Sequence, residues 1–258
     1  MIMLDKLSPP PSHLSLRELT APFDWLQTAV SLPQLLNMPK GDGRPVLLAP
    51  GFMTDKWSMR PLKQFLTKLN YDVYDWNLGR NKGDVDEDII RLGRQTLELS
   101  LELEKPITLI GWSLGGVICR EVARLFSDAV NEVITLGTPV TGGPKYTAPG
   151  KRYAAMKNID MDELEKEIAE RNALGFEQPI TVLFSKRDGV VSWRAALDVY
   201  NDQARHIEID GTHLGLGIHR QSWRAIAFVL AGQTKELQFS DLSTLLAKPR
   251  LTLHSDAV

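Results

Sequence analysis

The stretch that decides the fold reads Ile107-Thr108-Leu109-Ile110-Gly111-Trp112-Ser113-Leu114-Gly115-Gly116. Its first four residues form a short apolar run that predicts a buried strand, and an apolar pattern with helical spacing follows the last glycine. A serine on a tight turn between a strand and a helix takes strained backbone angles, so bulky side chains two positions away would collide. Glycine at Gly111 and Gly115 removes those collisions. The stretch therefore predicts a turn that presents the Ser113 hydroxyl at a helix N-terminus, whose partial positive charge favours developing negative charge.

Outside this stretch, short apolar strands alternate with segments of helical spacing from Val46 onward. We expect strands at 46–49, 71–76, 107–110, 133–136, 180–184 and 206–209. Helical spacing occurs at 62–69, 86–103, 117–126 and 221–230. Fully apolar strands that alternate with helices predict an α/β fold, with a mostly parallel sheet covered by helices on both faces. Ligands of such sheets bind at the carboxyl ends of the strands, and Ser113 follows one of these ends.

Two segments flank this core, which we expect to span residues 45–232. Residues 1–44 form a leader, of which 1–20 is rich in Pro and Ser and is expected to be loose, while 22–36 has the spacing of an amphipathic helix. The apolar face of that helix, made by Phe23, Leu26 and Val30 and extended by Leu36, is expected to pack on the core; an anchor for a membrane or a partner is the alternative. Residues 233–258 form a tail, with a short helix at 241–247 and a mobile end from Lys248.

An insertion at about 141–178 interrupts the alternation. It begins with Gly142-Gly143-Pro144 and continues with a polar, acidic segment in which Met161, Leu164 and Ile168 share one helical face. We expect a small cap over the site; a purely structural excursion is the alternative.

The composition fits one globular α/β domain and gives no sign of a nucleic-acid partner. Of 258 residues, 43% are hydrophobic and 24% are charged, and the net charge of -2 provides no electrostatic footprint for nucleic acid. The chain does not begin with a basic stretch followed by a long apolar run, and no uncharged apolar run approaches the roughly 18 residues of a spanning helix. We therefore expect a cytoplasmic protein. The single cysteine, Cys119, excludes an internal disulfide and is expected to be a buried packing residue rather than a redox group or nucleophile.

A serine hydroxyl needs a base to take its proton, and the chain offers five histidines. In folds with this type of turn, the chain order is Ser, then acid, then His. His13 precedes the serine, His254 lies in the tail, and His206 falls within the last strand, where a packed or edge residue is expected. His213 follows that strand by a short loop, which is where the base should lie, and His219 is the chief alternative.

Asp188 is the candidate acid that would orient the histidine and stabilise its imidazolium. It follows the strand at 180–184 and lies one strand before the histidine loop. An ordinary turn aspartate before glycine is the alternative interpretation. Asp210 is closer to His213 in sequence, but a residue at a strand end has less freedom to reach the ring. The position therefore favours Asp188.

Two backbone N–H groups are expected to bind the oxyanion. One belongs to Leu114, the residue after the nucleophile, and the other to the loop Pro50-Gly51-Phe52-Met53, with Phe52 preferred and Met53 next. Trp112 and Met53 are candidates for the substrate pocket, and a packed aromatic beside the turn is an equal alternative for Trp112.

These motifs resemble the lipase and esterase branch of the α/β-hydrolase superfamily, and in particular a poorly characterised bacterial group within it. The likeness rests on Gly-Trp-Ser-Leu-Gly-Gly after a strand, on Pro-Gly-Phe upstream, and on Ile-Thr-Leu-Gly-Thr-Pro at 134–139 followed by two glycines. The segments 184–193 and 211–219 are similar to the acid and histidine loops of that group. The resemblance spans residues 45–230 and implies the α/β-hydrolase fold, with Ser113, Asp188 and His213 as the catalytic residues.

The leading hypothesis is hydrolysis of a small or lipid-like carboxylic ester through an acyl-enzyme on Ser113. Acyl transfer to an alcohol or thiol, and thioester hydrolysis, use the same triad and stay open. A non-catalytic binding protein that retains the fold is the alternative from another class, and the complete triad argues against it. No cluster of histidines and carboxylates has the spacing of metal ligands, so neither a metal nor a cofactor is implied.

Overall fold

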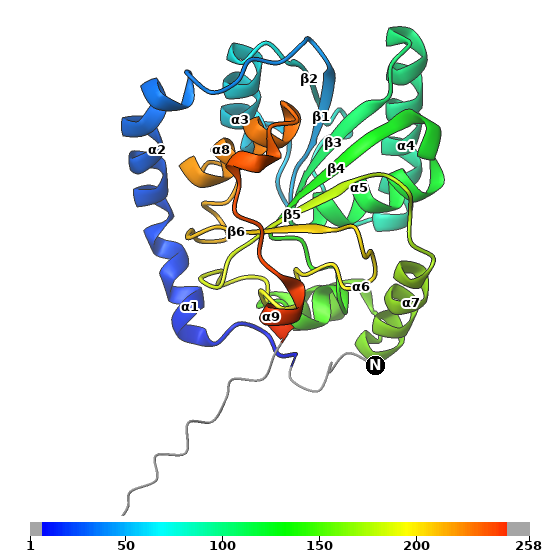
Figure 1. Ribbon diagram of the computed structural model, residues 1–258. Helices are drawn as coiled ribbons and strands as arrows, with labels where there is room; N and C mark the ends of the chain where they lie inside the picture. Colours follow the sequence, from blue (N-terminus) through cyan, green and yellow to red (C-terminus); the bar gives the residue numbers. More distant parts are fainter. Residues whose placement is uncertain (1–6, 247–258) are drawn as a thin grey trace, which may run out of the picture.

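Six parallel strands form one sheet within residues 7–246, the part of the chain that the computed structural model describes (Figure 1). The strand order is β2-β1-β3-β4-β5-β6, and each neighbouring pair is parallel. The strands are β1 Pro45–Ala49, β2 Asp72–Asp75, β3 Ile107–Trp112, β4 Val130–Leu136, β5 Ile180–Phe184 and β6 Arg205–Glu208. The predicted parallel sheet is confirmed, and the predicted strands differ from these bounds only at their ends.

Helices cover both faces of the sheet (Figure 1). α3 (Lys56–Lys68) and α8 (Arg220–Leu230) pack on one face, while α4 (Val85–Leu103) and α5 (Leu114–Leu125) pack on the other. Successive side chains of a strand point to opposite faces, so β1 contributes to two cores. Val46 and Leu48 join the core with α3 and α8, whereas Leu47 and Ala49 join the core with α4 and α5. Burial on both sides explains why each strand is a continuous apolar run in the sequence.

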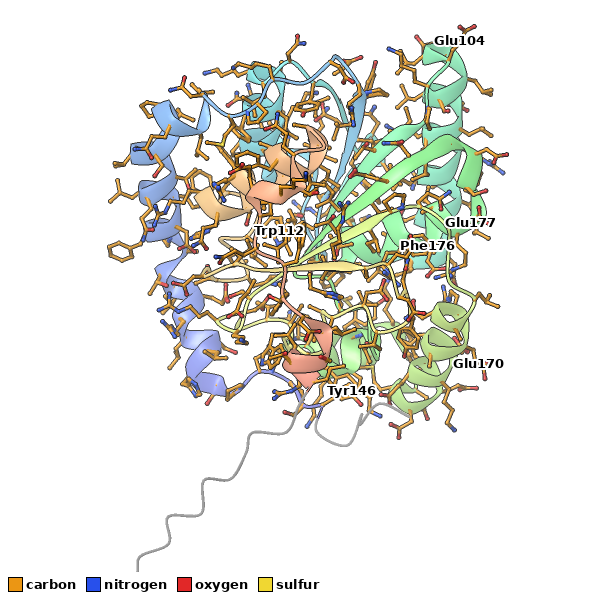
Figure 2. All side chains as sticks on the ribbon, in the orientation of Figure 1. Glu104, Trp112, Tyr146, Glu170, Phe176 and Glu177 are labelled. Carbon is orange, nitrogen blue, oxygen red and sulfur yellow. The ribbon has the colours of Figure 1, made fainter. Side chains whose placement is uncertain are left out.

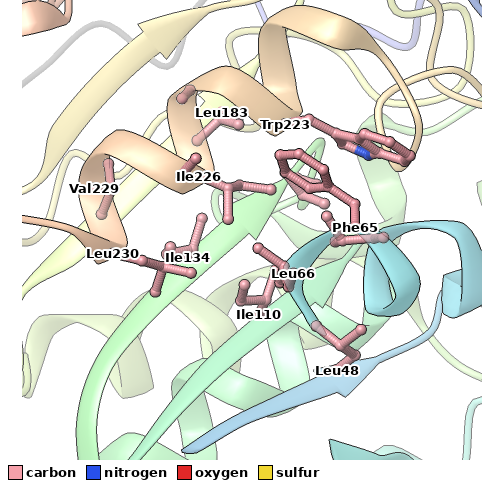
Figure 3. Packing of buried hydrophobic residues seen from close by; sticks show 14 of the residues in the cluster. Leu48, Phe65, Leu66, Ile110, Ile134, Leu183, Trp223, Ile226, Val229 and Leu230 are labelled. Carbon is pink, nitrogen blue, oxygen red and sulfur yellow. The ribbon is translucent and has the colours of Figure 1, made fainter. Parts of the chain in front are cut away.

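Aromatic and aliphatic side chains fill the core between α3, α8 and the sheet (Figure 3). Phe65 of α3 and Trp223 of α8 stack with their ring centroids 4.6 Å apart. Ile226 of α8 belongs to the same cluster as Ile134 of β4. Because α8 begins just after the predicted histidine loop, this core fixes where that loop ends.

The insertion at 141–178, called the cap below, contains more regular structure than the sequence predicted. It holds the 3-10 turn η3 (Gly143–Tyr146) and two helices, α6 (Gly150–Lys157) and α7 (Met161–Ala173). The Tyr153 hydroxyl donates a hydrogen bond of 3.0 Å to the Gly83 carbonyl, and Lys157 pairs with Asp84 at 2.6 Å. These contacts fasten α6 to the loop that precedes α4.

The N-terminal segment contradicts two predictions. Residues 12–20, expected to be loose, form the helix α1 (Ser12–Arg17) and the 3-10 turn η1 (Glu18–Thr20), and α2 (Ala21–Leu35) follows directly. The helix packs on the core as predicted, through Leu35 and Leu36, but the predicted packing of Phe23, Leu26 and Val30 is wrong, since these side chains are 65%, 61% and 75% exposed. The inward side of the segment also carries Glu18 and Asp24, both buried. Their carboxylates accept hydrogen bonds from backbone groups of the core, and these bonds set which side of the helix faces inward.

η4 (Thr234–Glu236) and α9 (Leu242–Leu246) follow α8. The short helix predicted at 241–247 is confirmed by α9, whose leucines pack against the core. Residues 1–6 and 247–258, including the predicted mobile end from Lys248 and His254, lie outside the described residues. Among the helices of residues 7–246, none is long and apolar enough to cross a membrane.

Candidate active site

Ser113 occupies a strained position between β3 and α5. Its backbone angles, φ 54° and ψ -121°, lie in a region that residues with side chains rarely adopt. A Cβ on Gly111 would lie 2.4 Å from the Gly116 Cα, and a Cβ on Gly115 would lie 2.4 Å from the Ala49 carbonyl oxygen. Neither glycine position has room for a side chain. The turn is therefore tightly packed, and it leaves Ser113 half-buried at the N-terminus of α5.

Asp188 and His213, which lie far apart in sequence, form a hydrogen-bonded pair. The His213 Nδ1 atom lies 2.7 Å from the Asp188 Oδ2 atom. The other carboxylate oxygen of Asp188 accepts hydrogen bonds from the N–H groups of Val190 (2.8 Å) and Val191 (2.7 Å). Both side chains are buried. The pair fixes the orientation of the imidazole and leaves Nε2 as the nitrogen for proton exchange with a substrate or nucleophile.

Two opposing effects act on the imidazole of His213. Burial alone would lower its pKa, but the charge of Asp188, the hydrogen bond to Asp188 and the charge of Glu18 together raise the pKa above its ordinary value. The site thus favours the imidazolium that forms when a base takes a proton.

Gly137, which directly follows β4, lies between the serine turn and the Asp188–His213 pair. A Cβ on Gly137 would lie 3.0 Å from both the Asp188 Oδ2 and the His213 Nδ1 atoms. The preceding residue, Leu136, accepts a 2.8 Å hydrogen bond from the Ser113 N–H. The Trp112 indole also donates to the His213 carbonyl at 3.2 Å, and Trp112 lies near the centre of the fold (Figure 2). Among the described residues, no hydrogen bond joins the Ser113 hydroxyl to His213.

The alternative residues have other surroundings. His219 lies at the start of α8, where its Nδ1 accepts a hydrogen bond of 3.3 Å from the Gln221 N–H. His206 is buried on the edge strand β6, as predicted, and accepts from the Asp198 N–H. Asp210 forms an exposed ion pair with Arg187 at 2.6 Å and does not contact His213. Cys119 is fully buried, which confirms a packing role, and burial raises the pKa of its thiol.

The two predicted oxyanion donors stay available. Within residues 7–246, the backbone N–H groups of Leu114 and Phe52 have no acceptor. The Met53 N–H, by contrast, donates to the Asn81 carbonyl at 2.7 Å. The backbone therefore supports Phe52 rather than Met53 as the second donor.

A cavity of about 400 Å³ opens beside Ser113. Apolar side chains of the cap and of α5 supply much of its wall, among them Val117, Tyr153, Ile159, Leu164 and Ile168. Trp112 and Met53, predicted as pocket residues, are not among the described residues that line this cavity. Trp112 is buried under the histidine loop instead, and Met53 is half exposed.

Sequence reasoning missed two acidic residues beside the histidine loop. Glu18 accepts hydrogen bonds from the backbone of both the Asp188 loop and the His213 loop, and Asp24 accepts from Thr212. The hydrogen bonds that they accept come from backbone N–H groups and one hydroxyl, so they leave no motif in the sequence.

Comparison with solved structures identifies the fold. A mature lipase from Bacillus licheniformis has a TM-score of 0.58 and 13% sequence identity, covering 75% of this chain and 94% of that chain. A monoacylglycerol lipase from Paleococcus ferrophilus (TM-score 0.54, 17% identity) covers 76% of this chain and 97% of its own. An esterase from Pyrococcus furiosus (TM-score 0.54, 18% identity) covers 76% and 83%. No protein-family model and no curated protein matches the sequence. At these identities the likeness concerns the fold alone, and it confirms the predicted α/β-hydrolase fold.

Proposed function

We propose that this α/β-hydrolase-fold protein is a serine hydrolase that cleaves carboxylic esters through an acyl-enzyme. The observation that carries the proposal is the 2.7 Å hydrogen bond between His213 and Asp188 at the sheet edge where the strained Ser113 turn lies. Lipases and esterases among the structural neighbours are consistent with this chemistry.

In the proposed reaction, His213 Nε2 takes the Ser113 hydroxyl proton as Oγ attacks the ester carbonyl carbon. The Leu114 and Phe52 N–H groups bind the oxyanion that forms. His213 then gives its proton to the departing alcohol, and an acyl-enzyme is left. A water molecule, deprotonated by His213, attacks the acyl carbon, and His213 then gives this proton to Ser113 Oγ as the bond to the acyl carbon breaks and the carboxylic acid leaves. The Asp188 side chain holds the imidazole by its hydrogen bond and stabilises the imidazolium at each stage.

The apolar cavity under the cap is the proposed acyl site. It begins at Ser113 and Leu114, and the apolar side chains that line it favour a hydrocarbon chain. We infer that the acyl group lies under the cap, so the substrates are esters with a moderately apolar acyl chain.

Labelling with a fluorophosphonate probe tests the function. We expect the folded protein to be labelled at Ser113 and to hydrolyse a p-nitrophenyl ester, and we expect Ser113→Ala to lose both properties. Equal labelling of the two proteins, or no labelling of a folded wild type, would overturn the proposal.

A further inference from the structure

We propose that Glu18, in the N-terminal segment, is a positioning residue for the catalytic histidine, a role that rests on the proposed function. Its buried carboxylate accepts three backbone hydrogen bonds. Oε1 accepts from the Gly189 N–H at 2.8 Å and the His213 N–H at 2.9 Å, and Oε2 accepts from the Leu214 N–H at 2.9 Å. Because Gly189 directly follows Asp188, one carboxylate joins the acid loop to the histidine loop.

The N-terminal segment also contacts both loops beside Glu18. The Ser15 hydroxyl donates to the Gly189 carbonyl at 2.8 Å, and a Cβ on Gly189 would lie 2.2 Å from the Leu14 carbonyl oxygen. Asp24 accepts hydrogen bonds from the Thr212 N–H (3.2 Å) and the Thr212 hydroxyl (2.9 Å). The backbone of the histidine loop is thus held at Thr212 and at His213 by carboxylates from a segment nearly 200 residues earlier in the chain.

Glu18 also acts on the charge of the imidazole. The described titratable groups that act on His213 are Asp188 and Glu18; Asp24, which is bonded to the neighbouring Thr212, lies 3.9 Å from His219. The negative charge of Glu18 favours the imidazolium in a buried site, and it contributes to the raised pKa of His213. A purely structural residue would affect folding without changing the ionisation of the base.

Glu18→Gln tests the role, because it preserves size but removes the charge and places an amide against backbone N–H donors. We expect kcat to fall by about 10- to 100-fold with KM nearly unchanged, since a misplaced base affects the chemical step. We also expect the acidic limb of the kcat/KM profile to move to lower pH. Glu132→Gln is the matched control: Glu132 is 8% exposed, against 9% for Glu18, and lies near the opposite, amino end of the sheet on β4. It should change neither quantity.

Serine labelling separates failure of this role from failure of the proposed function. If the wild type is labelled at Ser113 but Glu18→Gln keeps the wild-type kcat and pH profile, the positioning role is wrong and the function stands. If the folded wild type is not labelled, the function itself fails, and the role fails with it. If Glu18→Gln does not fold, Glu18→Asp is measured in its place. It keeps the charge but shortens the reach, so kcat should fall while the acidic limb stays near its wild-type pH; a wild-type kcat would reject the role.

The outward surface of the same segment is apolar. Five side chains, each 61–78% exposed, form a stripe along it: Leu16, Leu19, Phe23, Leu26 and Val30. Phe23, Leu26 and Val30 recur at spacings of three and four residues, which places them on one side of α2, while Leu16 and Leu19 precede them on α1 and η1. α2 lies on the outside of the molecule, with α8 between it and the sheet (Figure 1).

The exposed charged side chains near this apolar stripe indicate which class of partner it binds. Within residues 12–35, both acidic side chains are turned inward and buried, and Arg17 is the exposed Lys or Arg; the exposed Lys40 and Asp42 follow the helix. The contact surface between two helices normally has charged residues of both signs along its edges, and this apolar stripe does not. An apolar face with a neighbouring cation, on a segment (residues 12–35) without an exposed carboxylate, matches an anionic lipid surface. We infer that the apolar stripe docks the protein on anionic lipid bilayers.

Co-sedimentation with vesicles tests this docking without any need for activity. We expect the protein to bind phosphatidylcholine vesicles that contain phosphatidylglycerol at least about tenfold more tightly than phosphatidylcholine alone. The double variant Phe23→Asp/Leu26→Asp should lose this binding. Leu101→Asp, at a site that is 70% exposed on α4 across the sheet, should retain it.

Three outcomes would overturn the docking proposal. The first is that the protein binds neither kind of vesicle, and the second is that the double variant binds as tightly as the wild type. The third is a dimer of the wild type in light scattering that Phe23→Asp/Leu26→Asp dissociates, because a second copy would then cover the stripe. We expect a monomer in both proteins.

Discussion

Two histidines lie between β6 and α8, and their surroundings predict different effects of substitution. His213 pairs with Asp188, so His213→Ala should lower kcat for a p-nitrophenyl ester by about 10⁴-fold or more. His219 accepts a hydrogen bond at the N-terminus of α8, so His219→Ala should lower the free energy of unfolding by about 1 kcal/mol and leave kcat nearly unchanged. Steady-state kinetics and urea unfolding of both variants check these values. The opposite ranking in kcat would make His219 the base.

The pH dependence of kcat/KM follows from the surroundings of His213. Only the neutral imidazole accepts a proton, so activity falls as the pH drops through its pKa. Burial would lower that pKa, but Asp188 and Glu18 raise it above its ordinary value of 6.5, so we expect the acidic midpoint above 6.5. Asp188→Asn removes the charge and should move the midpoint to lower pH. A wild-type midpoint below 6.5 in a pH series of kcat/KM would contradict this electrostatic picture.

The sequence predicted the Asp188–His213 pair but not Glu18, for a physical reason. Strands of a parallel sheet deliver their following loops to the same edge, and β5 and β6 are neighbours in the sheet, so the loops that carry Asp188 and His213 meet. Glu18 bonds to backbone N–H groups, which every residue except proline carries. Such contacts require no particular partner residue and therefore leave no pattern.

At the scale of elements, apolar periodicity located the buried strands well and the N-terminal helix poorly. The strand at 180–184 agrees with β5 at both ends, because a strand buried on both faces is apolar throughout. In α2 the same kind of pattern marks the exposed face, and the inward positions include Asp24 and Thr28. Periodicity finds a face without showing which way it points. The helix α6 of the cap has little apolar pattern at all, so it was not predicted.

The cap supplies a prediction about acyl selectivity. Ile168 of α7 lines the cavity beside Ser113, so Ile168→Trp should fill part of the proposed acyl site. We expect kcat/KM for p-nitrophenyl octanoate to fall at least about tenfold more than kcat/KM for p-nitrophenyl acetate. Leu174→Trp is the control, since Leu174 follows α7 but is 76% exposed. An equal loss on both esters would place the acyl chain elsewhere.

At the scale of the whole molecule, a buried ionic network joins the core, the cap and the edge of the sheet. Arg120 of α5 pairs with Asp198, which lies between β5 and β6, and both side chains are almost fully buried. Arg120 also donates to the Asn172 side chain of α7 at 3.2 Å, and Asn172 donates to the Val140 carbonyl at 2.8 Å. The sequence did not predict this network, because its members are separated by long intervals and belong to no common motif.

Loss of one partner of this network should destabilise the fold strongly. Arg120→Met leaves the Asp198 carboxylate buried without its cation, so we expect the free energy of unfolding to fall by about 3–5 kcal/mol. Adding Asp198→Asn should recover part of that loss, because the stranded charge is then removed. Lys157→Met is the control: it breaks a 2.6 Å pair whose side chains are 23% and 51% exposed, and should cost less than about 1 kcal/mol. Urea unfolding of the four proteins measures these differences. A similar cost for Arg120→Met and Lys157→Met would mean that water reaches Asp198 and that the network does not fasten the cap to the core.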